Sequence, residues 1–109
     1  MESIRDYIPH GKENAITRKY LVKICLNVGL IDTAVTDPDR AMRKLISEAR
    51  LVEPILSSDS GGYYKPTEKE YIELRKYIKR EEARAKSVFR GLKQARALYK
   101  TMGSEATGV

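Results

Sequence analysis

Histidine and cysteine are almost absent from the chain, which has one of each, His10 and Cys25. With a single cysteine no disulfide can form within the chain, and a metal or catalytic site built on histidine is nearly excluded. The sequence contains no nucleophile–base pair, no cluster of metal ligands and no cofactor motif. The pair Gly61-Gly62 is followed by neither the Lys-Ser/Thr nor the helix of a phosphate-binding loop. We therefore expect no enzymatic activity, no metal, no cofactor and no small-molecule ligand.

Long apolar runs are also missing. No stretch is long enough to span a membrane, and charged residues follow Met1 at once, which differs from a secretory signal. Together with the single cysteine, these absences lead us to expect a cytoplasmic protein with no membrane contact.

The charge of the chain is divided unevenly. The formal net charge is +6. Up to Tyr64, nine basic residues balance nine acidic ones, whereas twelve basic residues face six acidic ones from Lys65 onward. A basic excess points first toward nucleic acid or an acidic surface. Because the whole excess lies in the C-terminal part, the two parts need separate explanations.

The first 30 residues predict two helices separated by an extended segment. A short amphipathic helix is expected over residues 2–8, and Pro9 ends it. After an extended segment at residues 14–16, Thr17 has the character of a helix N-cap and Gly29 that of a helix stop. The residues that recur at helical spacing in this second helix, and that we expect to face the core, are Tyr20, Leu21, Ile24 and Cys25.

A third helix is expected over residues 38–50, because Asp37-Pro38 supplies a capping acid and a proline at the first helical position. Its apolar face consists of Ala41, Met42, Leu45, Ile46 and Ala49. Its opposite face carries Arg40, Arg43, Lys44 and Ser47. Asp37 and Asp39 repel phosphate at the start of this helix, which favours contacts from its middle.

Residues 54–65 predict a β-hairpin, because two short β-prone runs flank a Gly-rich turn at residues 59–62. Since side chains alternate along a strand, one of Tyr63 and Tyr64 is expected to point outward.

The C-terminal part predicts one long helix. Thr67 and Glu70 fit a capping box, and no proline follows before about Met102. At 1.5 Å per residue this helix is roughly 50 Å long, so much of it must project or pair with something. The predicted organisation is a folded domain over residues 1–66, a long basic helix over residues 67–102 and a flexible tail over residues 103–109.

The order of helix, short strand, two helices, hairpin and long helix matches a winged helix-turn-helix, a mostly α fold with a small β-hairpin. In that fold the third helix enters the major groove of double-stranded DNA, and the hairpin tip rests on phosphate or the minor groove. The residues expected to bind DNA, the two glycines through their amides, are Arg40, Arg43, Lys44, Ser47, Ser58, Ser60, Gly61, Gly62 and Lys65.

Three segments resemble small winged-helix proteins that are common in phages and prophages of Gram-positive bacteria. They are the opening run over residues 4–19, the hairpin over residues 54–64, and the Arg84-Ala85 and Leu92–Arg96 stretches of the long helix. The resemblance covers most of the chain and implies DNA binding. Residues 30–36 depart from the family's pattern, because the connection there is longer than the usual turn of about three or four residues.

The long helix carries a stripe of mostly apolar residues at alternating spacings of three and four, broken once at Glu81. We expect its first half, at Tyr71, Leu74 and Ile78, to pack on the N-terminal domain. The second half is expected to form a homodimeric coiled coil that sets two winged domains side by side. The residues expected at the dimer contact are Ala85, Val88, Leu92, Ala95 and Tyr99.

The leading hypothesis is a non-catalytic DNA-binding protein, either a transcription regulator or a replication accessory of a mobile element. The alternative is a protein-interaction adaptor, in which the winged helix is degenerate and the basic helix docks on an acidic partner. The neutral balance of the first 64 residues favours the alternative, whereas the basic face of the third helix and the hairpin favour DNA.

Overall fold

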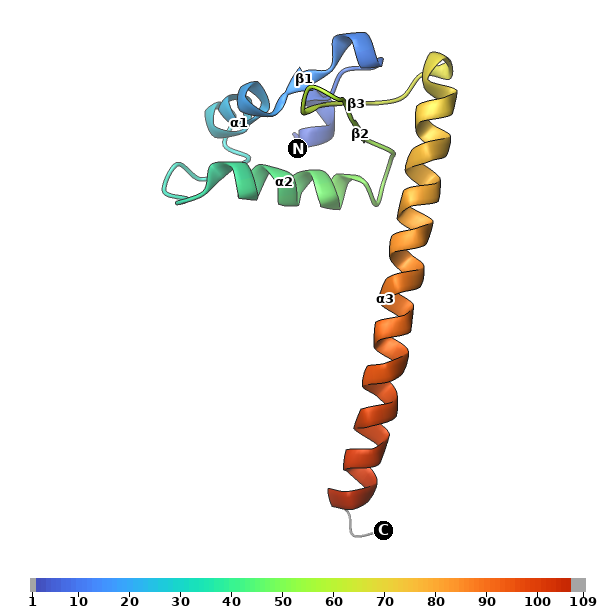
Figure 1. The fold of residues 1–109 in the computed structure, drawn as a ribbon. Coiled ribbons are helices and arrows are strands. Elements are labelled where there is room, and N and C mark those ends of the chain that lie inside the picture. Colours follow the sequence, from blue (N-terminus) through green and yellow to red (C-terminus); the bar gives the residue numbers. More distant parts are fainter. Residues whose placement is uncertain (1, 107–109) are drawn as a thin grey trace. The chain divides into compact units, whose positions relative to one another are not determined.

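A computed structural model describes the backbone of residues 2–106 and the side chains of residues 2–103. The chain is mostly helical, with a small three-stranded antiparallel sheet and a long C-terminal helix (Figure 1). It divides into an N-terminal unit that ends at Leu74 and a C-terminal unit that begins at Arg75.

Two α-helices form the larger part of the N-terminal unit, and both begin at the predicted caps. Helix α1 spans Arg18–Asn27, and the Thr17 hydroxyl accepts a hydrogen bond from the Tyr20 amide at 3.2 Å. Helix α2 spans Pro38–Ala49, with Asp37 accepting from the Arg40 amide at 3.1 Å. The predicted caps and the start of each helix are therefore confirmed.

The sheet joins a strand before the helices to the hairpin that follows them. Strand β1 is Ile16–Thr17, β2 is Leu56–Ser57 and β3 is Gly62–Tyr64. Their order is β1-β3-β2, and both pairings are antiparallel. The hairpin was predicted, whereas the pairing of β1 with β3 was not, because nothing in the local sequence selects a partner for two extended residues.

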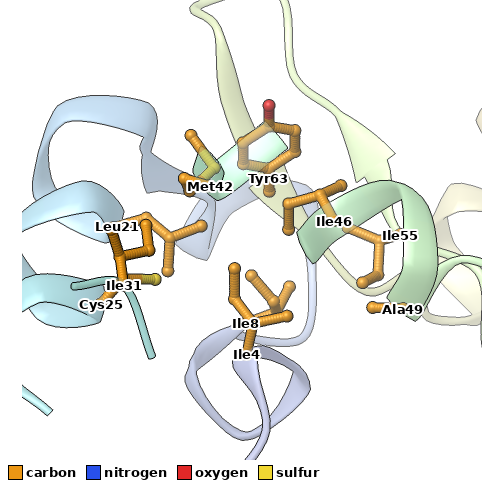
Figure 2. Packing of buried hydrophobic residues seen from close by; sticks show 10 residues of the cluster. All are labelled: Ile4, Ile8, Leu21, Cys25, Ile31, Met42, Ile46, Ala49, Ile55 and Tyr63. Carbon is orange, nitrogen blue, oxygen red and sulfur yellow. The ribbon is translucent and has the colours of Figure 1, made fainter. Parts of the chain in front are cut away.

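One hydrophobic cluster fills the space between the sheet, α1 and α2. Figure 2 shows its ten buried side chains, with the ring of Tyr63 over the cluster and its hydroxyl directed away. The cluster consists of Ile4, Ile8, Leu21, Cys25, Ile31, Met42, Ile46, Ala49, Ile55 and Tyr63. The predicted inner face of α2 is confirmed, since three of its five residues lie in this cluster and Ala41 and Leu45 pack against it.

The N-terminal segment contributes to this core through a turn shorter than predicted. Instead of a helix over residues 2–8, the chain forms a 3-10 helix at Ile4–Tyr7. A capping box between Ser3 and Asp6 stabilises its N-terminal end. A second 3-10 turn at Lys12–Asn14 leads into β1. The residues at both ends of the first turn, Ile4 and Ile8, are buried.

Two predicted tyrosine orientations are wrong. Tyr20 is 59% exposed, because the buried face of α1 centres on Leu21 and Cys25, with Val22 and Leu26 rather than Tyr20 on its flank. Tyr63 and Tyr64 are both buried, although alternation along β3 predicted that one would face solvent.

Helix α3 spans Tyr71–Ala106 and continues past Met102, where we had predicted its end. The predicted capping box between Thr67 and Glu70 is confirmed, and it precedes a short 3-10 turn at Glu68–Glu70. Within the N-terminal unit, Tyr71 is largely exposed and Leu74 is half-buried, so Tyr71 does not pack inward as predicted. Residues 107–109 of the predicted tail lie outside the described residues.

The close approach of β1 to β3 gives a stability test at Gly62. A Cβ atom there would lie 2.6 Å from the carbonyl oxygen of Ile16, whereas at Gly61 it would meet no atom within 4 Å. Gly61 has a φ of 87°, so alanine is strained at that position as well. We expect Gly62→Ala to lower the free energy of unfolding by about 2 kcal/mol or more, and Gly61→Ala by about 1 kcal/mol. Urea denaturation measures both variants, and an equal or smaller loss for Gly62→Ala contradicts the sheet pairing.

Candidate nucleic-acid interface

The outward face of α2 presents the four residues predicted to bind DNA. Arg40, Arg43, Lys44 and Ser47 are all exposed. They line one shallow hollow of about 560 Å³, together with residues 35–37 and Ala41. Because these four positions follow helical spacing, the inner face of α2 can pack in the core while the outer face stays open to a large partner.

Asp39 holds two arginines at the edge of this face. Its Oδ2 atom accepts from Arg18 at 2.7 Å and from Arg43 at 3.0 Å. The hydrogen bond and the charge of Asp39 raise the pKa of Arg18 above its ordinary value. The carboxylate that we expected to repel phosphate is therefore neutralised by two guanidinium groups, and it links the first turn of α1 to α2.

A second hollow lies next to the first and brings α1 together with the hairpin turn. Its volume is about 760 Å³, and it shares Thr36 and Asp37 with the hollow on α2. Ser60 and Gly61 of the turn line it. Three basic residues of α1 line it as well, namely Arg18, Lys19 and Lys23.

Sequence reasoning missed these three basic residues of α1. The available signal was the position of Arg18 and Lys19 directly after the Thr17 cap, with Lys23 four residues after Lys19 on the same helix face. That signal says only that the side chains share a face. Their proximity to the hairpin turn depends on the pairing of β1 with β3, which is non-local.

The basic residues of the N-terminal unit are concentrated on these two hollows. Six of the nine in the first 64 residues line them, and their only acidic companions there are Asp37 and Asp39. The neutral total of this segment thus conceals a polarised surface. The six are Arg18, Lys19, Lys23, Arg40, Arg43 and Lys44.

The backbone amides of the hairpin turn donate their hydrogen bonds within the turn itself. Gly61 donates to the carbonyl oxygen of Ser58 at 3.0 Å, and Gly62 donates to the Ser58 hydroxyl at 2.9 Å. The Ser58 and Ser60 hydroxyls lie 3.0 Å apart within hydrogen-bond distance, and Gly62 is buried. The two amides therefore have partners within the turn, which leaves the exposed Ser60 as the group that the turn offers to the hollow.

Lys65 lies in an internal ion pair rather than on the predicted interface. Its Nζ atom is 3.2 Å from Glu53 Oε1, and its side chain is mostly buried. Arg5 donates to the same oxygen at 2.9 Å, so Glu53 ties the N-terminal segment to the end of the hairpin. Burial alone raises the pKa of Glu53, but the hydrogen bonds and charges of Arg5 and Lys65 outweigh it and lower the pKa from the usual 4.5.

Arg50 also joins helix to hairpin. Its Nε atom donates to the carbonyl oxygen of Ile55 at 2.8 Å, and its guanidinium lies 6.0 Å from the centre of the Tyr63 ring. The end of α2 is thereby tied to the start of β2, which fixes the hairpin relative to α2.

The C-terminal unit offers a separate basic surface. Every described side chain from residue 82 to residue 103 is exposed, including the five predicted dimer residues. Arg84 lies 3.6 Å from Glu81 on the same helix. The basic side chains of this surface are Lys79, Arg80, Arg84, Lys86, Arg90, Lys93, Arg96 and Lys100.

Two other features are absent from the part of the chain that the structure describes. No group of three or more histidine, cysteine or acidic residues there is arranged to hold a metal ion. Among the described helices, none combines the length and the apolar character needed to cross a membrane. Comparisons with protein-family models, curated proteins and solved structures found no match.

The ion pairs of Glu53 predict a pH-dependent stability. Because the pKa of Glu53 is lowered in the folded state, its contribution is present above the unfolded value of about 4.5 and is lost as the pH falls through the folded value. We expect Glu53→Gln to reduce the free energy of unfolding by about 1 kcal/mol at neutral pH, and the difference from wild type to shrink below pH 4.5.

Urea denaturation across pH measures this difference. Glu48→Gln is the matched control, because Glu48 is exposed on α2 and has no ion pair among the described residues. A loss that is the same at every pH, or the same in both variants, contradicts the assigned role of Glu53.

Proposed function

We propose that this chain is a non-catalytic DNA-binding protein whose N-terminal unit is a winged helix-turn-helix. In this proposal α2 is the recognition helix, and the β2–β3 hairpin is the wing. The observation that carries the proposal is the concentration of six basic residues on two adjoining hollows, one over α2 and one between α1 and the hairpin turn.

The arrangement of the elements supports this assignment. Two helices followed by a hairpin, with β1 completing the sheet, have the element order of a winged helix. An α-helix fits the major groove, where each base pair presents a distinct pattern of donors and acceptors. Arg40 and Arg43 have the forked geometry that reads guanine, and Lys44 supplies a point charge for phosphate.

The adjoining hollow supplies contacts to the DNA backbone. Arg18 and Lys19 are the first two residues of α1, and Lys23 lies in its middle. Basic side chains at these positions can neutralise phosphates without reading sequence. Ser60 at the hairpin turn lines the same hollow, so the turn contacts the backbone beside α1. In this arrangement α2 reads bases while α1 and the turn position it.

The role in the cell follows from the family resemblance of the sequence. On that basis the protein is either a transcription regulator or a replication accessory of a mobile element. Both roles require the same interface on double-stranded DNA.

A protein-interaction adaptor is the second candidate, and α3 is the observation that favours it. Its basic side chains are exposed along the C-terminal unit, where an acidic partner has access to them. The polarised charge of the N-terminal unit favours DNA instead, because an adaptor has no need to collect basic residues on α1 and α2.

Matched double variants distinguish the basic surface of α2 from the basic surface of α3 as the site of DNA binding. Arg40→Ala/Lys44→Ala removes two charges from α2, and neither residue forms an ion pair among the described residues. Lys79→Ala/Lys86→Ala removes the same charge from α3. We expect the α2 variant to bind DNA roughly tenfold or more weakly, since a contact to a base edge is worth about 1–3 kcal/mol. The α3 variant should bind nearly as wild type.

Fluorescence anisotropy with a labelled random duplex, titrated across salt, measures these affinities. For wild type, log affinity should fall with log salt by about 0.9 per neutralised phosphate, and the α2 variant should have a shallower slope. A greater loss in the α3 variant assigns DNA to α3 and refutes the recognition helix. Wild type that does not bind even at low salt refutes DNA binding and leaves the adaptor.

A further inference from the structure

The exposed stripe on α3 has a defined repeat but no partner within the described part of its own unit. From Ile78 to Met102 its positions alternate at spacings of four and three, which is the heptad repeat of a coiled coil. Phe89 and Leu98 flank the stripe and widen it. The apolar residues of the stripe and its flanks that are most clearly exposed are Ile78, Val88, Phe89, Leu92, Leu98, Tyr99 and Met102.

A second copy of the same helix is the partner that this repeat fits, because a heptad stripe packs best against another heptad stripe. The orientation of the second copy is decided by the one charged residue in the stripe. In a parallel pair in register, Glu81 lies directly against the partner's Glu81. Two carboxylates facing each other in a helix interface repel and lose solvation.

We propose that α3 pairs with a second copy of this chain in antiparallel orientation, with Leu92 against the partner's Val88. This register places Ala85 against the partner's Ala95, and Ile78 against the partner's Met102. Glu81 then faces the partner's Tyr99, whose hydroxyl can donate a hydrogen bond to the carboxylate. Each core position receives an apolar neighbour or a hydrogen-bonding partner.

The flanking positions agree with the same register. Glu82 lies beside the partner's Arg96, so the twofold symmetry produces two attractive ion pairs. Phe89 lies beside the partner's Phe89 at the centre, where it extends the apolar contact. On this flank of the pair, charge and hydrophobicity are therefore complementary.

The neighbouring antiparallel register, shifted by one heptad, is less favourable. It places Arg75 beside the partner's Arg96, which is a repulsive pair. It also sets Glu81 against the partner's Leu92, where the carboxylate gains no donor. The charges of the helix thus favour the proposed register over this one.

An antiparallel pair changes the predicted arrangement of the dimer. The N-terminal ends of the two α3 helices, each joined to an N-terminal unit, lie at opposite ends of the pair. The side-by-side placement expected from the sequence requires the parallel pair. The antiparallel pairing does not depend on DNA binding, so either proposal can fail without the other.

Disulfide cross-linking of the full chain tests the orientation. We expect Ala85→Cys mixed with Ala95→Cys to give a cross-linked dimer under mild oxidation, while neither variant cross-links by itself. Wild type is the control for the native thiol, because Cys25 is fully buried and burial raises its pKa. Cross-linking of either variant alone indicates the parallel pair and overturns the proposal.

Charge exchange tests the register by an independent measurement. In sedimentation equilibrium, Arg96→Glu should weaken the dimer about tenfold, and Glu82→Arg/Arg96→Glu should restore it, because the exchanged pair is again attractive. In a parallel pair these positions face the partner's Tyr77 and Gly91, so the exchange has no such effect. A wild-type monomer at micromolar concentration, or an exchange that does not restore the dimer, overturns the proposal.

Discussion

Thr17 belongs to two elements at once, and the position of the candidate interface depends on this. It is the last residue of β1, where it faces Gly62 of β3, and it is also the N-cap of α1. The close approach of β1 to β3 requires that Gly62 lack a Cβ atom, and the register of the sheet therefore fixes the point at which α1 begins. The first residues of α1, Arg18 and Lys19, are thereby placed beside the hairpin turn. A slip of one residue would turn Ile16 away from the core and move the start of the helix with it.

Two carboxylates, Asp39 and Glu53, pair with basic residues of the N-terminal unit, and the two sets of ion pairs have different roles. Asp39 holds Arg18 and Arg43 at the surface, where each arginine lines one of the two hollows. Glu53 instead draws Arg5 and Lys65 into a partly buried cluster that closes the N-terminal segment onto the hairpin. The same kind of ion pair therefore organises a candidate binding surface in one place and stabilises the fold in the other, and the degree of burial makes the difference.

The parts of the fold that local chemistry controls were predictable from the sequence. Thr17, Asp37 and Thr67 each cap a helix or its leading turn, because a side-chain oxygen satisfies nearby amides without help from the rest of the chain. The inner and outer faces of α2 followed from helical spacing. What local chemistry does not determine is which distant segment covers a residue.

The predictions that failed or were missed depend on such distant segments. One of Tyr63 and Tyr64 was expected to point outward and Lys65 was expected to bind DNA, yet both tyrosines are buried and Lys65 is paired with Glu53. Likewise, the basic residues of α1 gained their place in the candidate interface only through the pairing of β1 with β3. A sequence pattern predicts which side chains share a face of a helix or strand. The tertiary contacts determine whether that face is buried, paired or exposed.

Helix α3 illustrates how a single residue can decide between assemblies that share the same apolar stripe. The heptad positions favour pairing but do not distinguish two orientations, because Val88 and Leu92 pack equally well in either. Glu81 makes the distinction, since it meets its own copy in one orientation and a tyrosine in the other. Alanines at positions 85 and 95 would bury little surface, so the proposed pair would depend more strongly on its charged flanks than a leucine-rich coil does. A weak apolar core together with charge-selected partners favours a reversible pair whose population follows the concentration of the protein.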